Sequence, residues 1–198
     1  MRVAVDATPL LGPRSGIGEF VFGLLGALPA QGLAIDAFAV SWRQRHGLRQ
    51  LLPSDVKFID RPLPARPLHE GWARANFPPI DFLIGRHDIV HGTNFVVPPT
   101  QWGKAIVTVH DLTPVHFPEM CLPQVRRFPD AIRRAIRRGA FVHTPSEAIR
   151  AEVIEYFAVN PERVRAIPHG IPTDSYLTVG PPTEALIEIN LAITRGMR

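Results

Sequence analysis

A short apolar run near the middle of the chain reads Ala105-Ile106-Val107-Thr108-Val109. Isoleucine, valine and threonine are β-branched, and the run shows no alternation between apolar and polar positions. Both features are typical of a strand that is buried on its two faces within a parallel sheet. A second run of this kind, Asp88-Ile89-Val90-His91, comes before it. The two runs predict the centre of a sheet that is covered by helices on both sides.

Further strand-like and helical segments alternate on either side of this centre. Strands are expected at residues 2–7, 33–40, 56–59, 88–91, 104–109, 140–143 and 164–167. Helices are expected from residue 20 to 28, around residues 70–76, at 124–138 and at 145–157, with a helical turn at 160–162. The segment Thr144-Pro145-Ser146-Glu147 predicts a capping box with Pro145 at the first helical position. The alternation predicts an α/β fold with a doubly wound parallel sheet, whose ligands lie beyond the carboxyl ends of the strands.

Length and composition limit the class of protein. The chain has 198 residues, enough for one substantial domain or slightly more. Cys121 is its single cysteine, which excludes an intrachain disulfide framework and favours a cytoplasmic protein. The longest apolar stretch, residues 20–30, is glycine-broken and too short to span a bilayer. A formal net charge of +4 is typical of a solvated surface, so nucleic-acid binding is not expected.

A glycine-containing segment before the first expected helix is the first candidate binding site. Gly16 and Gly18 allow the backbone to approach a ligand closely. The helix that follows directs free N–H groups and its positive dipole end towards this segment, which favours a phosphate. The spacing fits neither a Walker loop nor the dinucleotide-binding fingerprint. A turn that only leads into the helix is an equally good interpretation.

The second candidate site lies where the buried central run ends, at His110 and Asp111. The carboxyl end of a parallel strand opens on the ligand crevice, so His110 could bind a sugar hydroxyl or take up a proton. Asp111 could set the tautomer of His110, and His91 and Asn94 could line the same crevice. The alternative is a structural histidine that caps the strand. No metal site is expected, because the histidines show no ligand spacing on one element.

A series of short motifs follows in a fixed order along residues 1 to about 172. In order they are Val5-Asp6-Ala7, Ser15-Gly16-Ile17-Gly18-Glu19-Phe20, Asp88-Ile89-Val90-His91, Val107-Thr108-Val109-His110-Asp111-Leu112, His116-Phe117-Pro118-Glu119, Thr144-Pro145-Ser146-Glu147-Ala148, and Pro161-Glu162-Arg163-Val164 followed by Ile167-Pro168-His169-Gly170-Ile171. Together they resemble the N-terminal half of a family 4 glycosyltransferase, in which two Rossmann-like domains face each other in the GT-B fold.

The resemblance implies a retaining enzyme of polysaccharide biosynthesis. Such an enzyme transfers a hexosyl group from a nucleotide diphosphate sugar to a glycan or lipid-type acceptor, and the donor is a substrate, so no cofactor is implied. The N-terminal domain binds mainly the acceptor. By the same resemblance, Gly16, Ile17 and Gly18 border the diphosphate of the donor, and His110 lies at the reacting centre as the catalytic residue.

The end of the chain departs from the family pattern. Residues 1–172 are expected to form one acceptor-binding domain, and residues 173–198 a short tail with a remnant strand and helix. That tail is too short for the donor-binding domain of the family, so the chain alone is expected to be inactive. The family's Pro-Asn-Gly-Val/Ile-Asp hinge is replaced by Pro168-His169-Gly170-Ile171-Pro172.

Two alternatives come from other classes of protein. One is a noncatalytic subunit that pairs with a separate donor-binding chain and exposes an apolar surface for it. The other is a basic module that uses the expected helix at residues 124–138 to contact nucleic acid or the inner face of an anionic membrane. In that helix, Phe128, Ile132, Ala135 and Ile136 share one side and six arginines surround the other.

Overall fold

A computed structural model describes residues 1–13 and 15–170, and the expected tail at residues 173–198 lies outside this part of the chain. Within it, seven strands form one parallel sheet in the order β3-β2-β1-β4-β5-β6-β7. The strands are β1 (Arg2–Asp6), β2 (Ala34–Phe38), β3 (Lys57–Phe58), β4 (Ile89–Gly92), β5 (Lys104–Thr108), β6 (Phe141–Thr144) and β7 (Val164–Ala166). The expected α/β class and parallel, Rossmann-like sheet are therefore confirmed.

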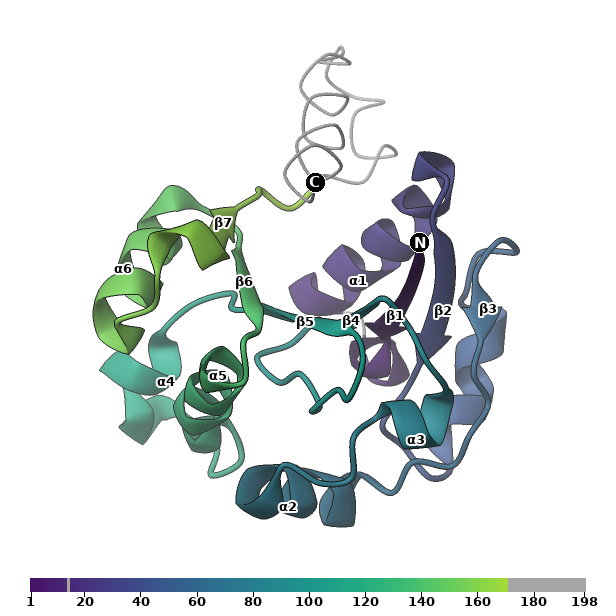
Figure 1. Ribbon diagram of the computed structural model, residues 1–198, viewed down its shortest axis with the longest axis horizontal. Helices are drawn as coiled ribbons and strands as arrows, with labels where there is room; N and C mark the ends of the chain where they lie inside the picture. The colour runs from purple at the N-terminus through teal and green to yellow at the C-terminus, as the bar shows by residue number, and fades with distance from the viewer. Residues whose placement is uncertain (14, 171–198) are drawn as a thin grey trace.

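Helices cover both faces of the sheet. They are α1 (Gly16–Ala27), α2 (Ala65–Ala75), α3 (Asp81–Ile84), α4 (Thr113–His116), α5 (Phe128–Arg137) and α6 (Glu147–Phe157). Short 3₁₀ turns connect them: η1 (Thr8–Leu11), η2 (Pro29–Gln31), η3 (Gln44–Gln50), η4 (Pro118–Met120), η5 (Val125–Arg127) and η6 (Pro161–Arg163). Helix α1 lies on one side of the central strands, and α2, α3 and α5 lie on the other (Figure 1).

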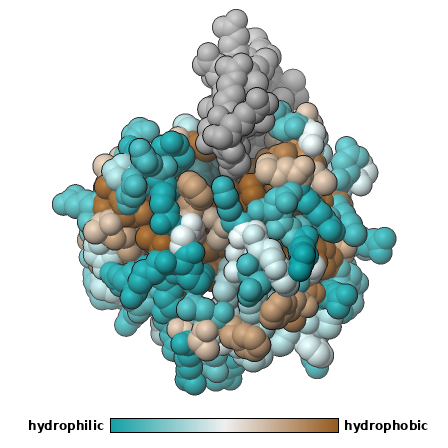
Figure 2. Space-filling model, in the orientation of Figure 1, coloured by the Kyte–Doolittle hydropathy of each residue, from teal (hydrophilic) through white to brown (hydrophobic). Residues whose placement is uncertain are grey.

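The alternation of side chains along each strand divides the core into two clusters. Val3 and Val5 of β1 pack with α1 on one face, whereas Ala4 between them belongs to the cluster on the opposite face. Val107 of β5 is fully buried. The central apolar run is thus buried on both sides, because helices cover both faces of a doubly wound sheet. On the outer surface, hydrophobic residues form separate patches among hydrophilic ones on the face shown in Figure 2.

Two helix starts differ from the sequence-based expectation. Helix α1 begins at Gly16 rather than near Phe20, because the Ser15 side chain caps it and accepts a hydrogen bond from Gly18 N at 3.4 Å. The expected capping box with Pro145 at the first helical position is wrong. Thr144 instead completes β6, and Ser146 caps α6 by accepting from Ile149 N at 3.3 Å.

Two other helices have different lengths from those expected. Helix α2 is longer, because Leu68 and Trp72 are buried one turn apart and extend it back to Ala65. The helix expected from residue 124 begins as the turn η5, and α5 starts at Phe128 with a proline in its first turn. Across residues 1–13 and 15–170, none of the helices combines the length and the apolar character that crossing a membrane requires.

Candidate active site at the carboxyl edge of the sheet

The strand order reverses between β1 and β4. The chain continues from β1 to β2 on one side, and later strands are added beyond β4 on the other side. In open α/β sheets this reversal leaves a crevice at the carboxyl ends of the two strands, where ligands bind. Thr93, which follows β4, donates its hydroxyl hydrogen to the carbonyl oxygen of Asp6 at 2.6 Å. This bond ties together the two loops that border the crevice.

The loop after β4 turns back sharply on itself. A Cβ atom at Gly92 would lie 2.0 Å from the Val96 carbonyl oxygen, so only glycine fits there. Phe95 adopts a left-handed conformation with φ of 58° and donates from its N–H to the Thr108 carbonyl at 2.9 Å. Non-glycine residues in this conformation concentrate at functional sites. The tight loop directs the carbonyl group of Thr93 towards His110.

Four histidines lie at or just beyond the carboxyl ends of neighbouring strands, and we call them the histidine cluster. They are His91 in β4, His110 after β5, His143 in β6 and His169 after β7. Phe20 of α1 packs on three of them, with ring centroids 4.0 Å from His169, 5.6 Å from His110 and 5.7 Å from His143. The first turns of α1 therefore lie against the cluster, which places the glycine segment at the same edge of the sheet.

Thr108 joins two buried histidines through its single hydroxyl group. His143 Nε2 lies 2.8 Å from the Ile167 carbonyl oxygen, so this nitrogen carries the proton and donates. His143 Nδ1 is then an acceptor and receives the Thr108 hydroxyl hydrogen at 3.0 Å. The Thr108 oxygen in turn accepts from His91 Nε2 at 2.8 Å. The Ile167 carbonyl group thus sets the tautomers of both rings.

His110 and His169 form a second pair. His110 Nε2 donates to the Thr93 carbonyl oxygen at 2.8 Å, so its Nδ1 is an acceptor. His169 Nε2 lies 3.1 Å from that Nδ1 and donates to it. His169 Nδ1 is then left as a bare acceptor, and this buried atom has no hydrogen-bond partner among the described residues. Within the described part of the chain, the pair therefore ends in an unsatisfied lone pair.

Burial keeps the cluster uncharged at neutral pH. It lowers the pKa of His91 to about 3 and that of His143 to about 4, and neighbouring histidines lower the pKa of His91 further. Burial also lowers the pKa of His169 to about 4 and moves that of His110 below its usual value. Neutral imidazoles can accept hydrogen bonds, as the two networks require. Burial raises the pKa of Asp6, on the other side of the crevice, to about 6.

The structure places the residues singled out from the sequence at this edge, but in different surroundings. Gly16, Ile17 and Gly18 form the first turn of α1 rather than a loop before it. His91 is buried beneath the crevice against Thr108 instead of lining it. Asn94 carries a buried side-chain oxygen that is unpaired among the described residues.

The sequence suggested that Asp111 could set the tautomer of His110, but in the structure it does not. Its carboxylate accepts from Thr113 N at 2.8 Å, whereas the ring nitrogens of His110 contact Thr93 and His169. His116 lies apart from the cluster and pairs with Glu152 at 3.0 Å. No group of three side chains suited to a metal ion occurs in residues 1–13 and 15–170.

Four members of the site were not predicted from the sequence: His143, His169, Thr108 and Phe20. A signal for two of them was present, because His143 ends an expected strand and His169 follows another, as His91 and His110 do. Thr108 and Phe20 gave no such signal. Their roles depend on the register that sets Thr108 opposite His143 and on the packing of α1 over the strand ends.

The fold and the site together define an α/β domain with a ligand crevice at its topological switch point. Residues 14–175 match the family described as Glycosyltransferase Family 4, and the chain belongs to this family. A glycosyltransferase from Rickettsia africae ESF-5, known from its crystal structure, aligns with 14% sequence identity and a TM-score of 0.48. The alignment covers 100% of this chain and 49% of that protein, so the chain spans about half its length. A search of curated proteins found no match.

Proposed function

We propose that the chain is the acceptor-side domain of a retaining glycosyltransferase. The whole enzyme transfers a hexosyl group from a nucleotide diphosphate sugar to a carbohydrate or lipid-linked acceptor in polysaccharide biosynthesis. The activated donor is itself a substrate, so the proposal includes no separate cofactor. Membership of Glycosyltransferase Family 4 supports the class of reaction, and the crevice at the switch point supports the place of binding.

The observation that carries the proposal is the state of His110. Its Nε2 is fixed on a backbone carbonyl group, so its Nδ1 is the one ring nitrogen that can accept from a ligand. His169 donates to that nitrogen, yet its own Nδ1 has no hydrogen-bond partner among residues 1–13 and 15–170. A buried acceptor without a partner costs about 1–3 kcal/mol. In the proposed complex a sugar hydroxyl replaces the His169 N–H at His110 Nδ1, and this contact orients the sugar at the reacting centre.

The leaving diphosphate needs stabilisation of negative charge. The N–H groups of Gly16 and Ile17 begin α1 and make no hydrogen bond to a described residue, whereas Ser15 caps Gly18. The amino end of a 12-residue helix carries partial positive charge and favours an anion. In the proposed reaction this end supplements the cations of the donor-binding part of the enzyme. Preorganised dipoles of this kind are a large source of rate enhancement.

A transfer assay tests the function. The whole polypeptide that carries this chain is incubated with a panel of nucleotide diphosphate hexoses and with glycan and lipid-linked acceptors, and the anomeric configuration of the product is determined by NMR. The expected product keeps the configuration of the donor. A product of inverted configuration, or hydrolysis without transfer under every pairing, would contradict the proposal.

A second part of the proposal is that this domain contacts the inner face of the cell membrane through anionic lipids. Phe117, Met120 and Leu122 are exposed after α4, and the arginines of η5 and α5 follow them in the chain. Exposed apolar side chains next to cations match an interface of acyl chains and anionic headgroups. Such contact would bring the domain to a lipid-linked acceptor.

A further inference from the structure

A groove of about 690 Å³ opens at the carboxyl ends of β1 and β2, away from the histidine cluster. Leu11 of η1 and Val40 give it an apolar wall, and Thr8, Trp42 and Arg43 line it as well. The groove is shallow and open to solvent, and its lining combines apolar walls with a few polar groups that could orient a ligand. Gly12 also lines the groove and lies in the β1–α1 connection that leads to Gly16. The groove therefore shares the β1–α1 connection with the amino end of α1.

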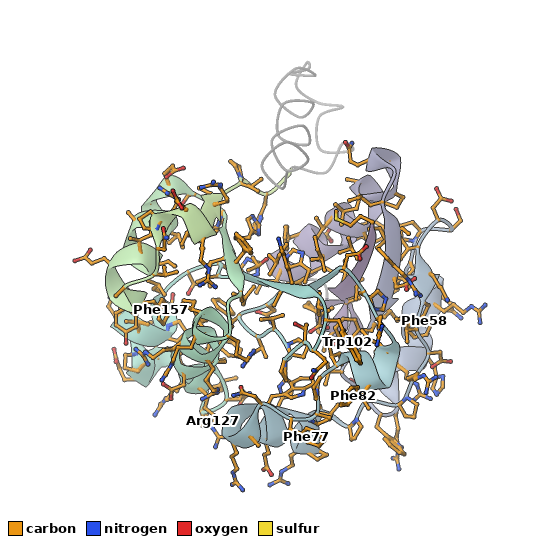
Figure 3. All side chains as sticks on the ribbon, in the orientation of Figure 1. Phe58, Phe77, Phe82, Trp102, Arg127 and Phe157 are labelled. Carbon is orange, nitrogen blue, oxygen red and sulfur yellow. The ribbon has the colours of Figure 1, made fainter. Side chains whose placement is uncertain are left out.

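Two exposed tryptophans differ in a way that points to the groove. Trp42 is 56% exposed and Trp102 is 49% exposed. The ring of Trp102 is already covered, because Arg86 lies 4.1 Å from its centroid and Phe82 packs edge-on at 5.6 Å. Figure 3 shows Phe82 and Trp102 next to each other. No aromatic or cationic side chain of the described residues packs on the ring of Trp42, so its face is available to a ligand.

The backbone around Trp42 is held in place, although its ring is exposed. Arg45 donates from its guanidinium to the Trp42 carbonyl and pairs with Asp60 at 2.7 Å. The carbonyl group of Ser41 accepts from Leu63 N at 3.1 Å, and its hydroxyl oxygen accepts from Gln44 N at 3.2 Å. An aromatic ring on a fixed backbone gives a ligand contact area at low conformational cost.

The charge in the groove has one sign. Among the described residues that line it, Arg43 is the one that carries a charge, and it forms no ion pair with a described residue. The neighbouring Arg45 is neutralised by Asp60. An arginine and an exposed tryptophan that line one groove fit a ligand that has both an apolar ring face and an anionic group, because arginine binds phosphate and carboxylate through a rigid fork of donors.

We infer that this groove binds the acceptor through a hexose unit that carries an acidic group. The sugar ring stacks on Trp42, and its acidic group pairs with the Arg43 guanidinium. The inference rests on the proposed function for the role of acceptor, and it adds a place and a chemical class to it. It requires neither a new contact in the histidine cluster nor a change in the fold.

Isothermal titration calorimetry on the full chain tests the inference with four probes: glucose 1-phosphate, glucuronic acid, methyl glucoside and inorganic phosphate. The two acidic sugars are expected to bind more tightly than methyl glucoside and than phosphate alone, because they use both contacts. The stronger of the two identifies the acidic group as a phosphate or a carboxylate. Absence of binding by both acidic sugars, or equal binding of the neutral sugar, would overturn the inference.

Matched variants locate the binding site. Trp42→Ala is expected to weaken binding of the acidic sugars about tenfold, which corresponds to the loss of one aromatic contact. Trp102→Ala removes an equally exposed ring outside the groove and is expected to leave binding unchanged. Arg43→Gln is expected to reduce the acidic sugars to the affinity of methyl glucoside. Equal effects of the two tryptophan variants, or an unchanged preference in Arg43→Gln, would contradict the assignment.

The transfer assay separates this inference from the proposed function. Transfer that persists unchanged in Trp42→Ala over the full range of acceptor concentrations would remove the groove as the acceptor site and leave the glycosyltransferase function standing. Binding of acidic sugars at Trp42 without transfer from any donor would support the groove as a binding site for acidic sugars and would contradict the glycosyltransferase function. If both are correct, Trp42→Ala raises KM for the acceptor and changes kcat little.

Discussion

The Thr108 hydroxyl is the hydrogen-bond partner of two buried imidazoles, those of His91 and His143. Valine has nearly the same shape, but it can neither donate to His143 Nδ1 nor accept from His91 Nε2. Each buried polar group that loses its partner costs about 1–3 kcal/mol. We therefore expect Thr108→Val to lower the free energy of unfolding by about 2 kcal/mol or more, measured by urea denaturation.

The matched control for this variant is Thr100→Val. The Thr100 hydroxyl makes one hydrogen bond, to the Gly103 carbonyl at 2.7 Å, and the residue is half-buried. We expect this variant to cost about 1 kcal/mol or less. Equal losses in the two valine variants would show that the Thr108 network contributes no more than an isolated hydrogen bond.

The histidine cluster also predicts how stability depends on pH. The pKa of His91 is about 3 and those of His143 and His169 are about 4 in the folded chain, against 6.5 for a free histidine. Between about pH 6.5 and 4 the unfolded chain therefore binds more protons than the folded one, so stability is complete above pH 6.5 and decreases as the pH falls. Asp6, whose pKa is raised to about 6, acts in the opposite direction with a single group.

Urea midpoints measured from pH 7.5 down to 4.5 check this dependence. We expect the midpoint to decrease below pH 6.5, and to decrease less steeply in His143→Gln, which removes one of the protons taken up on unfolding. A midpoint that stays constant or rises over this range would show that the imidazoles are accessible to protons in the folded state.

At the scale of elements, the sequence was most informative where the chain is buried on both faces. The run at residues 105–109 lacks polar alternation, and this alone predicted a central strand and the position of His110 at its end. Helix starts were less predictable. The residues after Ser15 are compatible with more than one helix start. Ser146, and not Thr144, caps α6 because β6 extends through Thr144.

Helix α5 illustrates a pattern that was correct in outline but incomplete. Ile132 and Ala135 are buried and Phe128 and Ile136 pack against the core, as their spacing predicted. Not every arginine on the other side faces solvent. Arg138 is half-buried and donates to Asn76 Oδ1 at 2.8 Å and to the Val97 carbonyl at 2.9 Å, so it holds α2 and the β4–β5 connection against α5.

The remaining arginines test the proposed membrane contact. Arg127, Arg134 and Arg137 form no ion pair with a described residue, so their replacement by glutamine should leave the fold intact. Each cation near an anionic surface contributes about 1 kcal/mol. We expect the triple variant to bind anionic vesicles at least about tenfold more weakly, measured by vesicle sedimentation.

The control removes the same charge from another part of the surface: Arg49, Arg61 and Arg74 are exposed and are replaced by glutamine together. Binding to vesicles should then change little. If both triple variants lose binding equally, only the net charge matters, and the proposed contact through α5 is wrong.

At the scale of the whole molecule, the fold class was predictable but the site was so only in part. The alternation of strands and helices predicts a parallel sheet, in which the carboxyl ends of all strands lie at the same edge. They do not fix which strands are neighbours. The bond from Thr108 to His143 exists because β5 lies beside β6 in one register, and the pair of His110 with His169 exists because β7 ends beside them.

The central claim is that His110 binds and orients the reacting sugar rather than holding the strand end. The most direct measurement is the rate of hexosyl transfer per folded molecule in the whole polypeptide, for the wild type and His110→Ala, together with the thermal unfolding midpoint of each. We expect transfer per folded molecule to fall about a hundredfold or more. The midpoint should decrease only moderately, through the loss of the hydrogen bonds of His110 to Thr93 and His169. A large loss of folded protein with specific activity preserved would show that His110 is structural and would contradict the account.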